Sequence, residues 1–192
     1  MNPLGTGNYN VAFGINDSGQ VVGYYAGTER SSEANLSGLN YVPGINDSGQ
    51  VVGYSRTTDG LDHAAIVGSS GVGIRDLGTL GGTTSLAHGI NNSGQAVGEA
   101  QLANGFSHAY ITGPNGIGMR DLGTLRGNGS IAWGINESGR VVGSSITAAG
   151  NEYRAFITGP NGVGIRASMR DALAAGAGFM RSLYSMDACE RH

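Results

Sequence analysis

The residues best able to do chemistry are two histidines that recur at one place in a repeated motif. His63 and His108 each precede an alanine and an apolar run, and Arg154 stands at the third occurrence. A zinc site built on such a repeat needs a His, Cys or carboxylate ligand in every copy or at ligand spacing nearby. Because arginine replaces histidine in the third copy, we expect no metal here. We expect the two rings to have a structural role, such as capping a neighbouring unit through a ring N–H.

Acidic residues recur in two further motifs. Asp76 and Asp121 each follow an arginine, and we expect these carboxylates to pair across units or to accept hydrogen bonds from turn amides. Four Asn-x-Ser-Gly turns also carry one acidic or amide residue each: Asp17, Asp47, Asn92 and Glu137. Calcium takes about six to eight oxygens, usually including several carboxylates, and no second carboxylate follows at loop spacing. The turns therefore predict hairpins rather than calcium sites.

Motifs and composition argue against several function classes. The chain lacks a Gly-x-Ser-x-Gly elbow, a phosphate-binding loop and a Cys-x-x-Cys pair, and its one cysteine is Cys189, so we expect no enzyme and no cofactor. A net charge of −3 with 13% charged residues offers no basic surface to a nucleic acid. No apolar run is long enough to span a bilayer, and the N-terminal residues lack the features of a signal peptide. We expect neither a membrane span nor a signal peptide in this chain.

A tandem repeat positions all of these residues. The motif Gly-Ile-Asn-x-Ser-Gly-x-x-Val-Gly begins at Gly14, Gly44, Gly89 and Gly134, at intervals of 30, 45 and 45 residues. Its asparagine can hydrogen-bond the backbone downstream and its second glycine supplies a positive φ, so each copy predicts a β-hairpin. A second hairpin with a glycine-rich turn follows each later copy, as at Gly113-Pro-Asn-Gly116.

Two hairpins in a unit of about 45 residues predict an all-β, propeller-like fold with four-stranded blades. Seven hairpins make about three and a half blades, and a β-solenoid is the alternative. The first interval, of 30 residues, is too short for two hairpins, which predicts an incomplete or atypical first unit. Because a closed propeller needs about four blades or more, we expect an open arc or completion by self-association.

One position on the first strand of each unit varies while its neighbours barely change. Period-2 alternation places Ala and Gly, as in Ala87 and Gly89, on a face that we expect to pack between units, and the isoleucine of Gly-Ile-Asn on the opposite face. Two residues before that isoleucine stand, in the four copies, Phe13, Pro43, His88 and Trp133. We expect Phe13, His88 and Trp133 to contact ligand, with Trp133 as the anchor; the alternative is a strand entrance that tolerates any residue.

The connections between the second and third strands also vary, over residues 56–62, 100–107 and 147–153. Loops on a rigid repeat scaffold commonly carry the binding residues.

The strand pattern covers residues 1–167. Ser168 and Asp171 then form an N-cap signal, and apolar spacing predicts a short C-terminal helix within a tail of residues 168–192 that covers the last sheet.

These motifs resemble the HAF family of probable extracellular repeats. The family unit carries a His-Ala-Phe-like triplet, then Asp-Leu-Gly-Thr-Leu-Gly-Gly, then Gly-Ile-Asn-x-x-Gly-x-x-Val-Gly. The resemblance covers roughly residues 9 to 166, with residues 76–82 matching the second motif in full and no copy holding the complete triplet. It implies a repeat architecture and an extracellular or envelope setting, and supplies no catalytic residue. Since family members are longer and carry export signals, it also implies that this chain is a fragment or a truncated reading frame.

We therefore expect a non-catalytic module for binding or surface display, with a glycan or an envelope protein as partner. The alternative is a structural spacer without a specific ligand.

Overall fold

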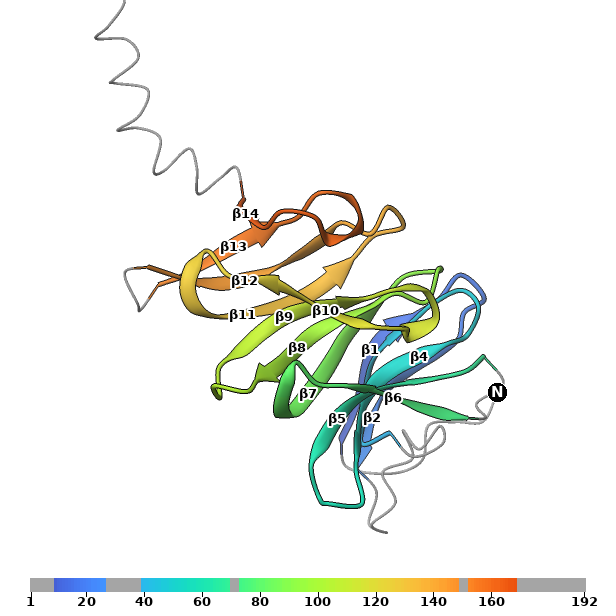
Figure 1. Cartoon of the computed structure of the whole chain (residues 1–192). Coiled ribbons are helices and arrows are strands. Elements are labelled where there is room, and N and C mark those ends of the chain that lie inside the picture. Colours follow the sequence, from blue (N-terminus) through green and yellow to red (C-terminus); the bar gives the residue numbers. More distant parts are fainter. Residues whose placement is uncertain (1–8, 27–38, 70–72, 149–151, 169–192) are drawn as a thin grey trace, which may run out of the picture.

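The computed structural model describes residues 9–26, 39–69, 73–148 and 152–168 (Figure 1). Its strands form four antiparallel sheets in which chain neighbours pair with one another. The first sheet, half-blade A, contains β1 (Tyr9–Ile15) and β2 (Val21–Ala26). Blade B contains β3 (Tyr41–Ile45), β4 (Val51–Arg56), β5 (Asp62–Val67) and β6 (Ile74–Gly78).

The later blades repeat this four-stranded order. Blade C contains β7 (Gly81–Ile90), β8 (Ala96–Leu102), β9 (Ser107–Thr112) and β10 (Met119–Gly123). Blade D contains β11 (Arg126–Ile135), β12 (Val141–Thr147), β13 (Tyr153–Ile157) and β14 (Arg166–Ala167). The short 3-10 turns Pro114–Gly116 and Pro160–Gly162 connect the outer strands of blades C and D.

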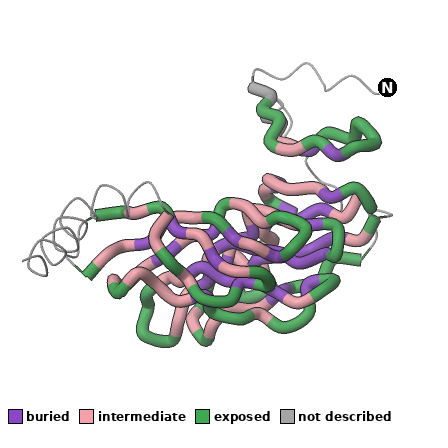
Figure 2. Tube along the Cα trace, turned by 90° about the horizontal axis from the view of Figure 1, so that it is seen from above, coloured by how far each residue is buried: buried purple, intermediate pink, exposed green. Residues whose placement is uncertain are grey.

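The blades stack face to face in chain order, with their first strands β1, β3, β7 and β11 in contact from one blade to the next. Figure 1 shows this succession, and Figure 2 shows the buried segments inside the body of the molecule. The buried apolar residues form three clusters, each joining two neighbouring blades. The propeller-like prediction is confirmed, and the structure describes two strands of the first unit. The predicted C-terminal helix of residues 168–192 lies outside the described residues from residue 169 onward.

A β-bulge interrupts the first strand of every unit. In blade C, Ala87 pairs with Gly98 and Gly89 with Val97, so His88 is one residue too many for the opposite strand. Phe13 and Trp133 are the extra residues of their strands in the same way, and the register shift of blade B includes Pro43. Proline is tolerated at a bulge because the extra residue takes no part in the ladder of hydrogen bonds. This freedom explains why the position varies so widely.

The bulge makes the sequence-based assignment of faces wrong. Ala87 and Ile90 both pack into the core between blades B and C. A Cβ on Gly89 would instead lie 3.5 Å from the Gly134 Cα of the following blade. One extra residue shifts the alternation, so alanine and glycine lie on opposite faces while alanine and isoleucine share one. Both faces pack between blades.

The bulge also dictates the glycine of Val-Val-Gly on the second strand. A Cβ built on Gly98 would lie 2.0 Å from the Leu86 carbonyl oxygen, and one on Gly53 would meet the Tyr41 carbonyl even more closely. The bulged strand pushes its carbonyl into the space that a side chain would fill. This glycine is therefore required by packing.

Aromatic rings fill the space between the outer strands of successive blades. Tyr110 of blade C is fully buried against Ile66 and Leu77 of blade B. Phe156 of blade D is buried in the same way against residues of blade C. Blade B has Ala65 at the corresponding position, on its face toward half-blade A.

Candidate binding surface

The histidines of the repeat bind aspartates of their own blade. His63 Nδ1 lies 2.8 Å from Asp76 Oδ2, and Asp76 also accepts a hydrogen bond of 2.7 Å from the Gly78 amide. His108 and Asp121 repeat this arrangement in blade C at 2.9 Å. The expected cap on a neighbouring unit is therefore wrong for the rings, whereas the expected hydrogen bond from a turn amide to the aspartates is present. A pair repeated in two blades fastens the third strand to the fourth.

The turn asparagines link each blade to the next. Asn46 Nδ2 donates to the Asn91 carbonyl at 3.0 Å, while Asn46 Oδ1 accepts from the Gln50 amide at 2.9 Å. The same cross-blade bond runs from Asn16 to Asn46 and from Asn91 to Asn136. One side chain thus closes its own hairpin and holds the following blade.

The acidic and amide residues of the turns form a parallel ladder. The Asp17 amide donates to Asp47 Oδ1 and the Asp47 amide to Asn92 Oδ1, both at 2.9 Å. The Asn92 amide donates to the Glu137 carboxylate at 3.2 Å. The Asp17 amide, followed by the Asn92 side chain, lowers the pKa of Asp47. These carboxylates therefore serve the assembly of the blades, and we name the end of the blades that carries the four Asn-x-Ser-Gly turns the turn rim.

The three predicted ligand residues divide between two places. The Phe13 ring lies against Tyr41 of blade B, with centroids 4.9 Å apart. The His88 and Trp133 rings lie 4.8 Å apart, at the junction of blades C and D. Trp133 is 54% exposed, and its Nε1 donates to Ser144 Oγ at 3.3 Å. Trp133 is therefore accessible to a ligand.

His88 lies in a mostly enclosed environment beside the carboxylate of Glu99. Its Nε2 is 3.8 Å from Glu99 Oε1, too far for a direct hydrogen bond. Among the described residues, His88 Nε2 and the Tyr110 hydroxyl are the buried side-chain atoms without a hydrogen-bond partner. Burial, and secondarily the Glu99 charge, raises the pKa of Tyr110. Tyr110 therefore stays a neutral phenol within the core.

The variable connections lie together at the opposite end of the blades. In an antiparallel meander the loops between second and third strands share one edge, away from the first hairpin turns. We name this edge, with the adjoining starts of β7 and β11, the loop rim. Tight turns shape it: the Thr57 amide donates to the Leu61 carbonyl, and the Leu102 amide to the Phe106 carbonyl, each at 2.8 Å.

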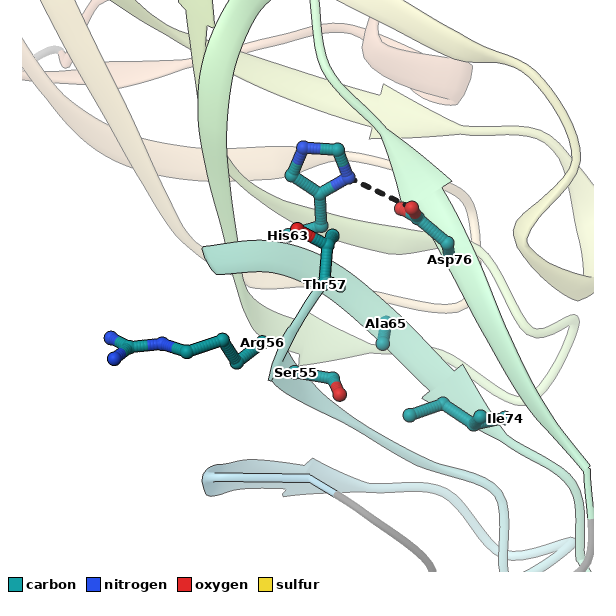
Figure 3. Close-up of a pocket in the computed structure, with 7 residues that line it drawn as sticks. All are labelled: Ser55, Arg56, Thr57, His63, Ala65, Ile74 and Asp76. Atoms are coloured by element: carbon teal, nitrogen blue, oxygen red, sulfur yellow. Dashed lines mark hydrogen bonds and ion pairs between the residues drawn. The ribbon is translucent and has the colours of Figure 1, made fainter. Parts of the chain in front are cut away.

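A first hollow of about 270 Å³ lies on blade B, facing half-blade A (Figure 3). His63 and Asp76 line it beside Ala65 and Ile74, whereas the Arg56 guanidinium extends away and pairs with Asp62 at 2.9 Å. Ile74 is 44% exposed here. Ala65 lines the hollow at the position where blades C and D carry an aromatic ring.

Two further hollows lie end to end along the loop rim. The one beside blades B and C has a volume of about 330 Å³ and is lined by Asp62, Leu86, Glu99 and Ser107. The one between blades C and D has a volume of about 290 Å³ and shares Glu99 and Ser107 with the first. Two exposed aromatic rings flank the second hollow, as its lining includes Phe106 and Tyr153 together with Asn128.

The exposure of those rings separates this site from the rest of the rim. Phe106 is 46% exposed and Tyr153 67% exposed. Both lie in the connections that vary between copies, but neither was among the residues predicted to contact ligand. The signal that could have found them is an aromatic residue in a loop, at a place where no repeat motif requires one.

Neither a family model nor a curated protein matches this sequence. Among solved structures, the fold is similar to the crystal structure of TolB from Acinetobacter baumannii, a β-propeller, with a TM-score of 0.52 and 15% sequence identity. The match covers 68% of this chain and 32% of that chain, so it spans about a third of the TolB protein. At this identity the likeness concerns the fold alone, and it agrees with the stacking of four-stranded meanders described above.

In the described ranges, no group of three or more His, Cys, Asp or Glu residues could hold a metal ion. No helix in these ranges is long and apolar enough to cross a membrane.

Proposed function

We propose that this chain is a non-catalytic recognition module whose loop rim binds an extended ligand. The observation that carries the proposal is the pair of adjoining hollows that share Glu99 and Ser107, one of them flanked by exposed aromatic rings. Ligand sites combine apolar surface with a few placed polar groups, which is the composition found here. The HAF resemblance supports an extracellular or envelope setting for this activity.

The chemistry of the second hollow favours a glycan chain as ligand. Phe106 and Tyr153 offer flat apolar faces that suit the C–H faces of sugar rings. Asn128, Ser107 and Glu99 offer both donors and acceptors to hydroxyl groups. The loop rim carries few basic side chains, so it supports a polyanionic ligand less than it supports a glycan.

The architectural use of the acidic and histidine residues supports a non-catalytic role. His63 and His108 bind Asp76 and Asp121 in two blades alike, which a single active site does not require. The turn carboxylates accept backbone amides of neighbouring blades. These groups are accounted for by the fold.

A glycan array followed by calorimetric titration of the best oligosaccharide tests the proposal. We expect Tyr153→Ala and Phe106→Ala each to weaken binding about tenfold or more, because they remove exposed aromatic surface of the kind that dominates binding energy. Glu99→Gln tests whether the carboxylate that lines both hollows accepts hydrogen bonds from the ligand. Val163→Ala and Ile117→Ala are matched controls, since these side chains are 66% and 65% exposed near the turn rim.

Binding that the control variants weaken as much as the loop-rim variants would place the site elsewhere. Absence of binding to every glycan on the array would overturn the glycan proposal and favour the structural spacer.

A further inference from the structure

The two hydrogen-bond ladders of the turn rim end in complementary groups. In blades B to D, the turn carbonyl and the next side chain accept hydrogen bonds from the preceding blade. The equivalent acceptors in half-blade A are the Asn16 carbonyl and the Asp17 carboxylate, and no described blade precedes them. At blade D, the Asn136 side-chain amide and the Glu137 backbone amide are the corresponding donors, and neither donates to another described residue. One end of the arc therefore offers what the other end lacks.

The two end faces also expose apolar side chains whose equivalents are buried at the internal junctions. Val21 of half-blade A is 51% exposed and Ile15 68% exposed, whereas the equivalent Val51 and Val141 are 2% and 0% exposed beneath their preceding blades. At the other end Val142 is 47% exposed, whereas Val52 and Val97, beneath their following blades, are both 0% exposed. Each end face thus carries the side chains that bury one another at the internal junctions.

We infer that these end faces are the two halves of one interface, and that a second copy of this chain occupies it head to tail. Asn136 and Glu137 of one copy then donate to the Asn16 carbonyl and the Asp17 carboxylate of the other. Val142 packs toward Ile15 and Val21 as the internal blades do. A pairing of two like end faces would oppose acceptors to acceptors or donors to donors, which disfavours it.

Two copies that join at both ends form a closed ring. Four blade positions in each chain give eight positions in the ring, at the upper end of the roughly four to eight blades of closed propellers. Head-to-tail contacts close in this way when the rotation between copies completes a circle. The inference goes beyond the proposed recognition, since it concerns the end faces and not the loop rim.

Complementary variants of the full chain test the inference by light scattering after gel filtration, from about 10 to about 500 μM because association depends on concentration. The wild type is expected at the mass of a dimer. Ile15→Asp and Val142→Asp, each at an exposed side chain, are each expected to be monomeric alone. Their equimolar mixture is expected to restore a dimer, since it retains one intact interface.

Val163→Asp, at an exposed position near the turn rim, is the matched control and is expected to remain dimeric. Circular dichroism spectra equal to wild type establish that the variants are folded. A monomeric wild type across the whole concentration range overturns the inference, and so does an end-face variant that dimerises alone. A mixture that stays monomeric overturns the head-to-tail geometry.

Discussion

The turn rim and the loop rim lie at opposite ends of the same strands, and they use their residues differently. At the turn rim Asn46, Asn91 and their neighbours repeat because each one bonds the next blade. At the loop rim Phe106 and Tyr153 stand in connections that differ between copies and flank a hollow. Repetition within this chain therefore marks the residues that assemble the blades. Outside the bulge position, the residues that vary lie in the connections of the loop rim, where we propose that ligand binds.

The largest contrast is expected between a glycine opposite the bulge and a glycine of the loop rim. Gly98→Ala places a Cβ 2.0 Å from the Leu86 carbonyl, so the bulge or the strand must move, and we expect a loss of unfolding free energy of about 3 kcal/mol or more. Gly105→Ala has nothing within 4 Å, although its φ is +87°. We expect about 1 to 2 kcal/mol for this backbone strain. Urea unfolding of both variants checks the order, and equal losses would contradict the role of the bulge.

A second contrast concerns asparagines. Asn91 is 2% exposed and bonds Gln95 Oε1, the Gln95 amide and the Asn136 carbonyl. Asn91→Ala leaves buried polar groups unpaired, so we expect a loss of about 2 to 4 kcal/mol. Asn104 is exposed and accepts one bond from the Phe106 amide at 3.1 Å, so Asn104→Ala is expected to cost less than about 1 kcal/mol. Thermal unfolding that ranks the two variants in reverse would contradict the ladder.

The smallest effect is a pH dependence of the turn rim. Hydrogen bonds from Asp17 and Asn92 lower the pKa of Asp47 below its ordinary value of 3.8. A lowered pKa stabilises the fold above the ordinary value, and this contribution disappears as the pH falls through the lowered one. Asp47→Asn retains an acceptor oxygen, as Asn92 does in the next copy, but removes the titration. We expect the stability difference between wild type and variant to be constant above about pH 5 and to change below about pH 4.

Unfolding curves recorded across this range measure that difference. A difference that does not change with pH would show that the Asp17 amide does not recognise the carboxylate charge.

The repeat made the fold predictable, but the bulge was hidden. The spacing of the Gly-Ile-Asn motif and the chemistry of its turn predicted the hairpins, the short first unit and the order of the blades. Strict alternation then misplaced Ala87 and Ile90, because one extra residue reverses the faces of a strand. Pro43 inside a strand was the visible sign, since proline is placed in sheets at edges and bulges.

The candidate site was only partly predictable for a different reason. The variable loops pointed to the loop rim. Phe13, His88 and Trp133, however, were chosen because the residue type differs at this one position of each repeat, and the bulge accounts for that difference. The hollow on blade B lies at Ala65, on the face toward half-blade A, and locating it requires knowing how the sheets stack. Spatial order of the blades, rather than residue type, decides where the surface is hollow.

Amide hydrogen exchange measured residue by residue by NMR tests the contrast between the rims most directly. Asp47 and Asn92 have exposed side chains in tight turns, but their amides donate to the following blade at 2.9 and 3.2 Å. We predict that these amides exchange at least about 100-fold more slowly than those of Asp59 and Asn104, which lie in the turns of the loop rim. Equally rapid exchange at all four positions would contradict the claim that the repeated turns hold the blades together.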